Sequence, residues 1–254
     1  MIVDWVKSSL LEVQEYVRLL GQCARAIVTP PFYWHDIVEQ FDAIGIGSMA
    51  VVVLTGLFTG AVLALQSGFT LDQFGARSEV GRLVGASMVK ELGPVLTALM
   101  VSGRVGSGIA AELGSMVVTE QINALRALGT DPVRKLVVPR VLAGLVMVPA
   151  LTVISIAVGL AGAWLVTVGQ LRVASSIYWS SVFGGLFVQD VYMGLIKPFV
   201  LGFVIVTIGC HVGLRTSGGT QGVGRSTTTA VVASSVAVLA ADFFITKLLI
   251  WTLY

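Results

Sequence analysis

The chain has 254 residues, of which 56% are hydrophobic and 12% are charged, and its formal net charge is +2 at pH 7. Soluble domains carry about 25% charged residues, so this composition excludes an ordinary soluble domain and indicates a polytopic membrane protein. The small net charge, with no basic run, argues against nucleic-acid binding. Cys23 and Cys210 are the only cysteines and indicate neither a disulfide framework nor a metal site.

The N-terminal segment, residues 1–30, predicts an amphipathic helix that lies in the membrane interface. Apolar side chains recur along it at steps of three and four, and charged side chains take the other face. Asp4, Glu12 and Glu15 interrupt every window that would have to be the uncharged core of a signal peptide. A soluble helix docked on a partner would select the same apolar stripe, so that interpretation stays open.

Five apolar segments are each long enough to cross about 30 Å of hydrocarbon as a helix. We predict membrane spans at residues 43–71, 84–111, 141–170, 191–214 and 226–254. Residues 173–189 are apolar too, but their serines and aromatic residues favour an interfacial helix on the far side of the membrane. The predicted fold is a single all-α domain, residues 1–254, with an interfacial N-terminal helix and five transmembrane helices.

The second span carries an ionisable residue, Arg104, in the middle of its apolar run. A charge inside a span must be paired or face the protein interior or water, so we predict a structural pairing with Asp242, with Glu112 or with a backbone carbonyl. Small residues let another helix approach closely, and they form edges at Gly56 and Gly60 of the first span and at Ser102, Gly103, Gly106 and Ser107 of the second.

The positively charged residues of the connecting segments predict the orientation. If the N-terminus is cytoplasmic, that side holds nine Lys and Arg residues and the far side holds three. The nine are Lys7, Arg18, Arg25, Arg126, Arg134, Lys135, Arg140, Arg215 and Arg225, and the three are Arg77, Arg82 and Arg172. The positive-inside rule therefore places the N-terminus in the cytoplasm, and five spans place the C-terminus on the opposite side.

The cytoplasmic segment between the second and third spans, residues 117–130, predicts a short amphipathic helix. Its apolar face comprises Ile122, Leu125 and Leu128, Glu120 is polar, and Gly129 ends it. Such a helix can press into a groove on a soluble partner, as the coupling helix of ABC-transporter permeases does, whose layout it resembles. An ordinary interfacial connector remains the alternative.

The sequence offers no catalytic arrangement. The glycine-rich segment 219–226 resembles a P-loop with Arg225 in place of lysine, but a P-loop follows a strand and precedes a soluble helix. Here the segment joins two predicted spans, so a turn that begins the fifth span is favoured. We therefore expect the chain not to be an enzyme.

A series of motifs resembles the run that marks the MlaE (YrbE) family of permeases. The likeness covers nearly the whole chain from Trp5 onward. The motifs are Lys90-Glu91-Leu92-Gly93-Pro94, Gly103-Arg104-Val105-Gly106-Ser107, Ala111-Glu112-Leu113-Gly114, Thr119-Glu120-Gln121, Asp131-Pro132, Pro139-Arg140, Gly224-Arg225-Ser226-Thr227-Thr228 and Asp242-Phe243. Lys90 stands where arginine is familiar in the family.

This resemblance implies a permease subunit of a bacterial inner-membrane system that moves phospholipid between the inner and outer membranes and maintains outer-membrane lipid asymmetry. It implies a homodimer, two ABC ATPase subunits, a hexameric MCE-domain protein and often a STAS-domain subunit. No cofactor is expected in this chain, because ATP and Mg would be bound by the ATPase. The segment 117–130 would be the coupling helix, and the C-terminus would be periplasmic.

The lipid site is expected at the far-side mouth of the second span. Lys90 and Glu91 present adjacent opposite charges, which would meet both signs of a zwitterionic headgroup in a water-accessible vestibule. Leu71 and Phe74 match positions that line the lipid pocket of the family. Alternatively, the two charges only mark the water boundary of the helix. Two other functions stay open: a secondary transporter or channel driven by an ion gradient, with Glu91 and Asp242 as its carboxylates, and a membrane scaffold for a complex.

Overall fold

The structure, a computed structural model, describes residues 2–30 and 33–253. Every regular element in those ranges is a helix. Five continuous helical stretches are long and apolar enough to cross a membrane, and they run Trp34–Asp72, Arg77–Val118, Val133–Gly169, Val188–Leu214 and Gly219–Leu253. The prediction of an all-α protein with five transmembrane helices is therefore confirmed.

Short π-helical segments lie within the first two stretches and begin the third. The first stretch consists of α2 (Trp34–Phe41), η1 (Asp42–Ile46) and α3 (Gly47–Asp72). The second consists of the 3₁₀ turn η2 (Arg77–Glu79), α4 (Val80–Ser87), η3 (Met88–Leu92), α5 (Gly93–Val101), η4 (Ser102–Gly106) and α6 (Ser107–Val118). The third consists of η5 (Val133–Val137) and α8 (Val138–Gly169). Each π-helical segment contains a charged residue, and such segments are frequent at functional sites.

The helices extend beyond the predicted spans because they continue through charged residues, some of which are paired with neighbouring elements and some of which are exposed. The second stretch begins at Arg77 rather than at residue 84 and ends at Val118 rather than at residue 111. In the third stretch, Arg140 contacts the Glu112 carboxylate of α6 at 2.6 Å. A search for uncharged runs stops at such residues, whereas the helix continues through them.

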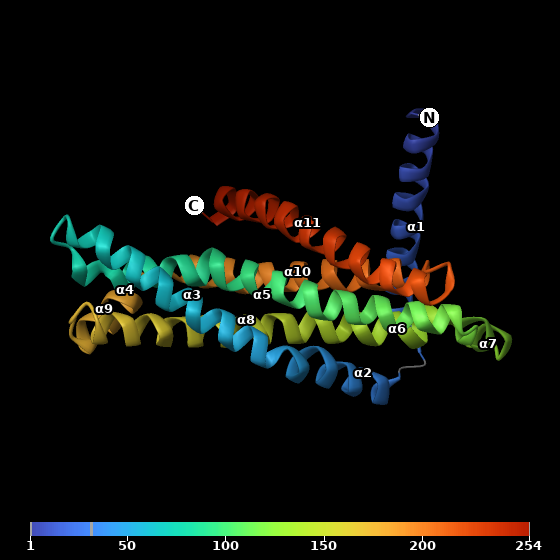
Figure 1. Cartoon of the computed structure of the whole chain (residues 1–254), viewed down its shortest axis with the longest axis horizontal. Coiled ribbons are helices and arrows are strands. Elements are labelled where there is room, and N and C mark those ends of the chain that lie inside the picture. The colour runs from blue at the N-terminus through green and yellow to red at the C-terminus, as the bar shows by residue number, and fades with distance from the viewer. Residues whose placement is uncertain (1, 31–32, 254) are drawn as a thin grey trace.

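Four of the long stretches run side by side along the long axis of the molecule, as Figure 1 shows for α3, α5, α6, α8 and α10 (Val188–Leu214). The short helices α4 and α9 (Ser175–Gly184) lie at one end, and α7 (Gln121–Ala127) lies at the other. The last helix, α11 (Gly219–Leu253), slants away from α10 toward the C-terminus. Its buried residues end at Val238, but Asp242 and Thr246 farther along α11 still contact Lys197 and Glu91 of the bundle.

Small residues set the distance between α3 and α8. A Cβ atom added at Gly60 would lie 1.9 Å from the Gly159 carbonyl oxygen, so only glycine allows this approach. In the second stretch, the Ser102 hydroxyl is 2.7 Å from the Ser234 hydroxyl of α11. These two small-residue edges are therefore used inside one chain, whereas a Cβ at Gly103 would meet nothing within 4 Å.

The N-terminal helix α1 (Ile2–Val28) crosses the bundle at the end that carries α7 (Figure 1). The hydroxyls of Tyr16 and Thr207 are 2.8 Å apart, and Cys23 is buried against the bundle. Leu10 and Val13 are 65% and 60% exposed. One half of α1 is thus docked on α10, while its middle presents apolar side chains outward.

The helix predicted at residues 173–189 is shorter in the structure. It corresponds to α9, which ends at Gly184 because α10 already begins at Val188. Tyr178 of α9 is fully buried, and its hydroxyl donates a hydrogen bond to the Leu160 carbonyl oxygen at 2.9 Å. This bond fixes α9 to the end of α8.

Candidate functional site

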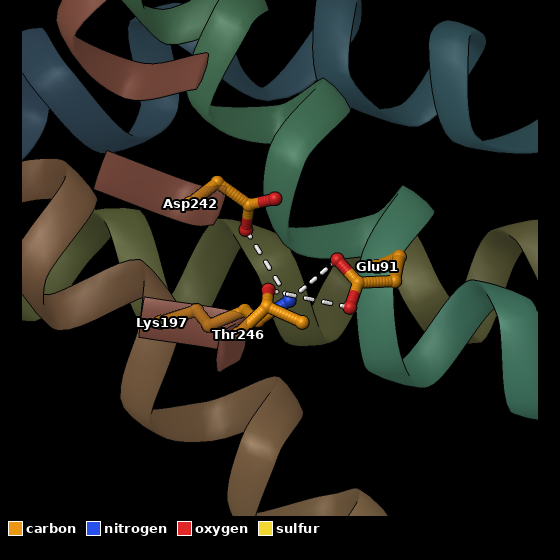
Figure 2. A network of polar contacts seen from close by, with 4 residues as sticks. All are labelled: Glu91, Lys197, Asp242 and Thr246. Carbon is orange, nitrogen blue, oxygen red and sulfur yellow. Dashed lines mark hydrogen bonds and ion pairs between the residues drawn. The ribbon is translucent and has the colours of Figure 1, made fainter. Parts of the chain in front are cut away.

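A network of charges links three helices inside the bundle. Lys197 of α10 is fully buried, and its Nζ lies 2.5 Å from a Glu91 carboxylate oxygen and 3.2 Å from an Asp242 oxygen. The Thr246 hydroxyl donates to the second Glu91 oxygen at 3.4 Å. Figure 2 shows that these side chains converge from η3, α10 and α11. Because a buried charge is tolerated only when it is paired, this network fixes the position of all three helices.

The neighbouring charge, Lys90, contacts a different partner. Its Nζ lies 2.7 Å from Asp190 Oδ1, and the Asp190 side chain also accepts a hydrogen bond from the backbone N–H of Phe187 at 3.0 Å. Lys90 and Glu91 are therefore both engaged by α10, at positions seven residues apart (197 − 190). The sequence indicates that Lys90 and Glu91 are unusual charges, but it does not identify Asp190 and Lys197 as their partners.

The helix that carries Lys90 and Glu91 continues beyond these two charges toward Arg77. The second stretch begins at Arg77, and Lys90 follows 13 residues later (90 − 77), which corresponds to about 20 Å of helix. This continuation is α4, whose one charged residue, Arg82, is exposed. The position of Lys90 and Glu91 at the far-side mouth of the span stays a prediction.

A surface hollow opens beside Lys90. Its volume is about 390 Å³, and its walls are formed by Leu71, Glu79, Arg82, Leu83, Ala86, Lys90, Gly185, Phe187 and Asp190. It thus brings together two of the four residues predicted for the lipid site, Leu71 and Lys90. Phe74 is 77% exposed and does not line the hollow, and Glu91 contacts Lys197 instead. We refer to this hollow as the Leu71–Lys90 hollow.

The segment predicted as one cytoplasmic helix, residues 117–130, is divided by a turn. Residues 117–118 end α6, and Glu120 adopts a left-handed conformation with φ 61°. The helix α7 follows, and Gly129, with φ 75°, ends it. The side chain of Asn123 donates a hydrogen bond to the Glu120 carboxylate, which bridges the turn and the first part of α7.

The three apolar residues of this segment lie in different environments. Ile122 is buried in the core at 4% exposure, Leu125 is partly buried against the same core, and Leu128 is 80% exposed. The predicted apolar face therefore attaches α7 to the bundle through Ile122. The leucine available to a soluble partner is Leu128.

Arg104 is held by oxygens of the first stretch. Its Nη1 donates to the Ala43 carbonyl oxygen at 3.3 Å and to the Ser48 hydroxyl at 3.2 Å. Of the three partners predicted for Arg104, the structure shows the backbone carbonyl, that of Ala43. Glu112 contacts Arg140, and the partner of Asp242 is Lys197.

Sequence reasoning missed Lys197 and Asp190, which both act through contacts with residues far away in the chain. A signal for Lys197 was present, because a lysine in a long apolar segment requires a carboxylate from another span. Glu91 and Asp242 were the available candidates. For Asp190 no such signal existed, since it lies at the start of α10, where an acidic residue is ordinary.

Comparison with known proteins identifies the family. The family described as Permease MlaE matches residues 37–248. A Rickettsia bellii protein named "Probable ABC transporter permease protein" is 46% identical over 88% of this chain and 86% of its own length. The "Intermembrane phospholipid transport system permease protein MlaE" of Haemophilus influenzae is 34% identical over 98% of both chains. The chloroplastic protein TRIGALACTOSYLDIACYLGLYCEROL 1 of Arabidopsis thaliana is 36% identical over 90% of this chain and 65% of its own. The family match includes at least part of each of the five membrane helices and all four residues of the charged network, and the chain belongs to the MlaE permease family.

Proposed function

We propose that this chain is the membrane subunit of an ATP-driven transporter that moves phospholipid between the inner and outer membranes and maintains outer-membrane lipid asymmetry. The family and the name of the Haemophilus influenzae relative support phospholipid as the substrate. The observation in the structure that carries the proposal is the Leu71–Lys90 hollow, which combines apolar walls with a salt bridge.

The hollow suits the part of a phospholipid where headgroup and acyl chains meet. Its volume of about 390 Å³ lies in the usual range of about 300–1,000 Å³ for ligand sites. Leu71, Leu83 and Phe187 offer apolar walls, and the Lys90 side chain, 31% exposed, supplies a cation for a phosphate. A second apolar hollow on α3, lined by Phe58, Val62, Leu63, Gln66 and Leu92 among others, offers a further surface for acyl chains.

Neither hollow encloses a whole two-chain lipid, so the proposal includes a homodimer that completes the chamber on its two-fold axis. ATP hydrolysis takes place on separate ABC ATPase subunits, which bind ATP and Mg and dock at α7. A hexameric MCE-domain protein, and possibly in addition a STAS-domain subunit, would complete the assembly. The chain lies in the bacterial inner membrane with its N-terminus cytoplasmic and its C-terminus periplasmic.

A site-directed labelling experiment tests the lipid site. In a variant without native cysteines, Leu71→Cys should react with a maleimide-bearing phospholipid, and Lys90→Ala should lower that reaction. Val153→Cys is the matched control, because Val153 is 49% exposed on α8 and does not line the Leu71–Lys90 hollow. Its labelling should not depend on Lys90. Equal labelling at both positions, unaffected by Lys90→Ala, would show that the probe only samples the outer surface.

A further inference from the structure

Arg104 is a charged residue within a membrane helix whose hydrogen-bonding capacity is mostly unused. A guanidinium group has five N–H donors, yet both contacts to Ala43 and Ser48 come from Nη1 and are 3.2 Å or longer. Among the residues that the structure describes, Nε and Nη2 donate no hydrogen bond and no carboxylate forms an ion pair with Arg104. Because an exposed charge in a membrane span is costly, this group requires an anion or water.

The guanidinium is nevertheless held in a defined position. A Cβ atom at Gly47 would lie 2.4 Å from Arg104 Nη1 and 2.8 Å from Nη2, so the group rests directly on the backbone at the start of α3. Arg104 itself is the central residue of the π-helical segment η4. The side chain is therefore positioned by the first stretch.

A third hollow adjoins this guanidinium. Its volume is about 240 Å³, and it is lined by Gln40, Ala43, Ile44, Arg104, Val105, Gly108, Ile109 and Glu112. Its lining is polar at Gln40, Arg104 and Glu112, whose side chain is 54% exposed, and apolar at Ile44, Val105 and Ile109. A Cβ atom at Gly108 would meet nothing within 4 Å, so the hollow is open above this residue.

This hollow is distinct from the Leu71–Lys90 hollow. Arg104 follows Lys90 by 14 residues (104 − 90), which places it about 20 Å farther along the second stretch. The direction is toward the end of the bundle that carries α7 (Figure 1). In the proposed orientation, that end is cytoplasmic.

We propose that the hollow at Arg104 is a second lipid-binding site, which holds a phospholipid headgroup from the cytoplasmic leaflet. The lipid phosphate binds the free Nε and Nη2 donors of Arg104, since a guanidinium matches a phosphate with two parallel hydrogen bonds. Oε1 of Glu112 is paired with Arg140, so its Oε2, together with Gln40, faces the amine of a phosphatidylethanolamine headgroup. Ile44, Val105 and Ile109, which line the hollow, contact the glycerol and the first carbons of the acyl chains. This inference rests on the proposed function, because it places two headgroup sites along one transport path.

The test uses the full chain with its partner ATPase in nanodiscs of equal parts phosphatidylethanolamine and phosphatidylglycerol. A small amount of phosphatidylethanolamine carries a photoactivatable group in its headgroup, and the labelled peptides are identified by mass spectrometry. We expect labelling of the peptide that contains residues 102–112. Arg104→Gln should reduce this labelling by about tenfold or more, the effect of losing one charge-assisted interaction.

Two glycine variants provide a test that does not remove the charge. Gly108→Val should fill the hollow and abolish labelling, whereas Gly103→Val should leave it unchanged, because Gly103 is equally open but does not line the hollow. Labelling that persists in Gly108→Val, or that is lost equally in both variants, would contradict the proposed site. Thermal unfolding of each variant establishes that it is folded.

Further measurements separate the possible failures. An excess of inorganic phosphate should not displace the lipid probe, because it lacks the apolar part of the ligand, and displacement would identify a phosphate site instead of a lipid site. Labelling of the peptide around Leu71 is followed in the same samples. If that peptide is labelled and lipid is transported while residues 102–112 stay unlabelled, only this inference is wrong. If wild-type protein transports no phospholipid, the proposed function is wrong regardless of binding at Arg104.

Discussion

Lys197 is buried and forms ion pairs with carboxylates from two other helical elements. Removing its charge should therefore lower the stability of the protein. Replacing Lys197 by methionine would retain most of its packing but leave Glu91 and Asp242 without their cation. Breaking a buried pair costs about 3–5 kcal/mol, and the 41% exposure of the Glu91 side chain places our expectation at about 3 kcal/mol. We predict that Lys197→Met lowers the free energy of unfolding in mixed micelles by that amount.

The control for Lys197→Met removes all three charges of the network at once. Lys197→Met combined with Glu91→Gln and Asp242→Asn should regain much of the stability, because no unpaired charge remains. Arg77→Ala, which breaks the exposed pair with Asp72, should leave the stability unchanged. If Lys197→Met alone is as stable as wild type, the network has no structural role. The same geometry indicates that Glu91→Lys would place two ammonium groups together, so its effect on lipid transport cannot be separated from misfolding.

The thiol of Cys23 reports whether α1 is docked. Burial raises the pKa of this thiol to about 11, so at neutral pH the reactive thiolate is scarce. We predict slow maleimide labelling of the Cys23 peptide at neutral pH and an increase as the pH approaches that pKa. Val13→Cys, on the exposed part of α1, should be labelled rapidly. Equal labelling rates at both positions at neutral pH would mean that α1 is undocked in solution.

At the scale of single elements, the connection between α6 and α8 should transmit the effect of ATP hydrolysis. Leu128 is 80% exposed, and Ile122 is 4% exposed. We predict that Leu128→Asp leaves the protein folded and inserted but removes the ATPase partner from the purified complex, because it places a charge in the docked surface. Ile122→Asp should instead destabilise the protein, since it buries an unpaired carboxylate. Undiminished copurification of the ATPase with Leu128→Asp would exclude this leucine from the docking surface.

The contact between α3 and α8 depends on the absence of side chains. In Gly60→Ala the new methyl group would overlap the Gly159 carbonyl, at 1.9 Å, so the two helices must separate at a cost of about 1–3 kcal/mol. Gly21→Ala on α1 is the matched control, because a Cβ there meets nothing within 4 Å. We expect unfolding measurements to show lower stability for Gly60→Ala alone. Similar stability of the two variants would mean that the close approach of α3 and α8 is not required.

The sequence predicted the number and type of these elements well, because length and hydrophobicity are local properties. It predicted their ends less well, since helices such as α4 continue through charged residues that lie outside any apolar run. The segment 117–130 illustrates a further limit. The spacing of its apolar residues correctly predicts a helix. The left-handed turn at Glu120 depends on how α6 meets α7, and the spacing carries no information on that.

At the scale of the whole molecule, the charged residues could be located from the sequence but not paired. Lys90 and Glu91 were correctly selected as unusual, yet their partners lie about a hundred residues later in the chain. The small-residue edges were equally ambiguous, because glycine spacing shows that a helix can approach but not which helix does. Only the assembled bundle assigns Gly60 to α8 and leaves Gly103 open.

The whole molecule also exposes surfaces that a second copy would cover in the proposed homodimer. The outer part of α11 and the middle of α1 expose apolar side chains, and each hollow is open on one side. We predict that native mass spectrometry of the protein in lipid nanodiscs detects a dimer, because two copies would enclose a chamber that one copy leaves open. A monomer that still binds the ATPase and transports lipid would contradict a chamber on the two-fold axis.

The central claim is that this chain moves phospholipid when a partner hydrolyses ATP. The most direct measurement reconstitutes the chain with its ABC ATPase and MCE-domain partners in vesicles and follows a fluorescent phosphatidylethanolamine between these vesicles and acceptor vesicles. We expect transfer that requires ATP and Mg, stops when the ATPase is omitted, and falls with Leu128→Asp. Transfer that continues without the ATPase and follows an ion gradient, or ATP hydrolysis with no movement of lipid, would contradict this account.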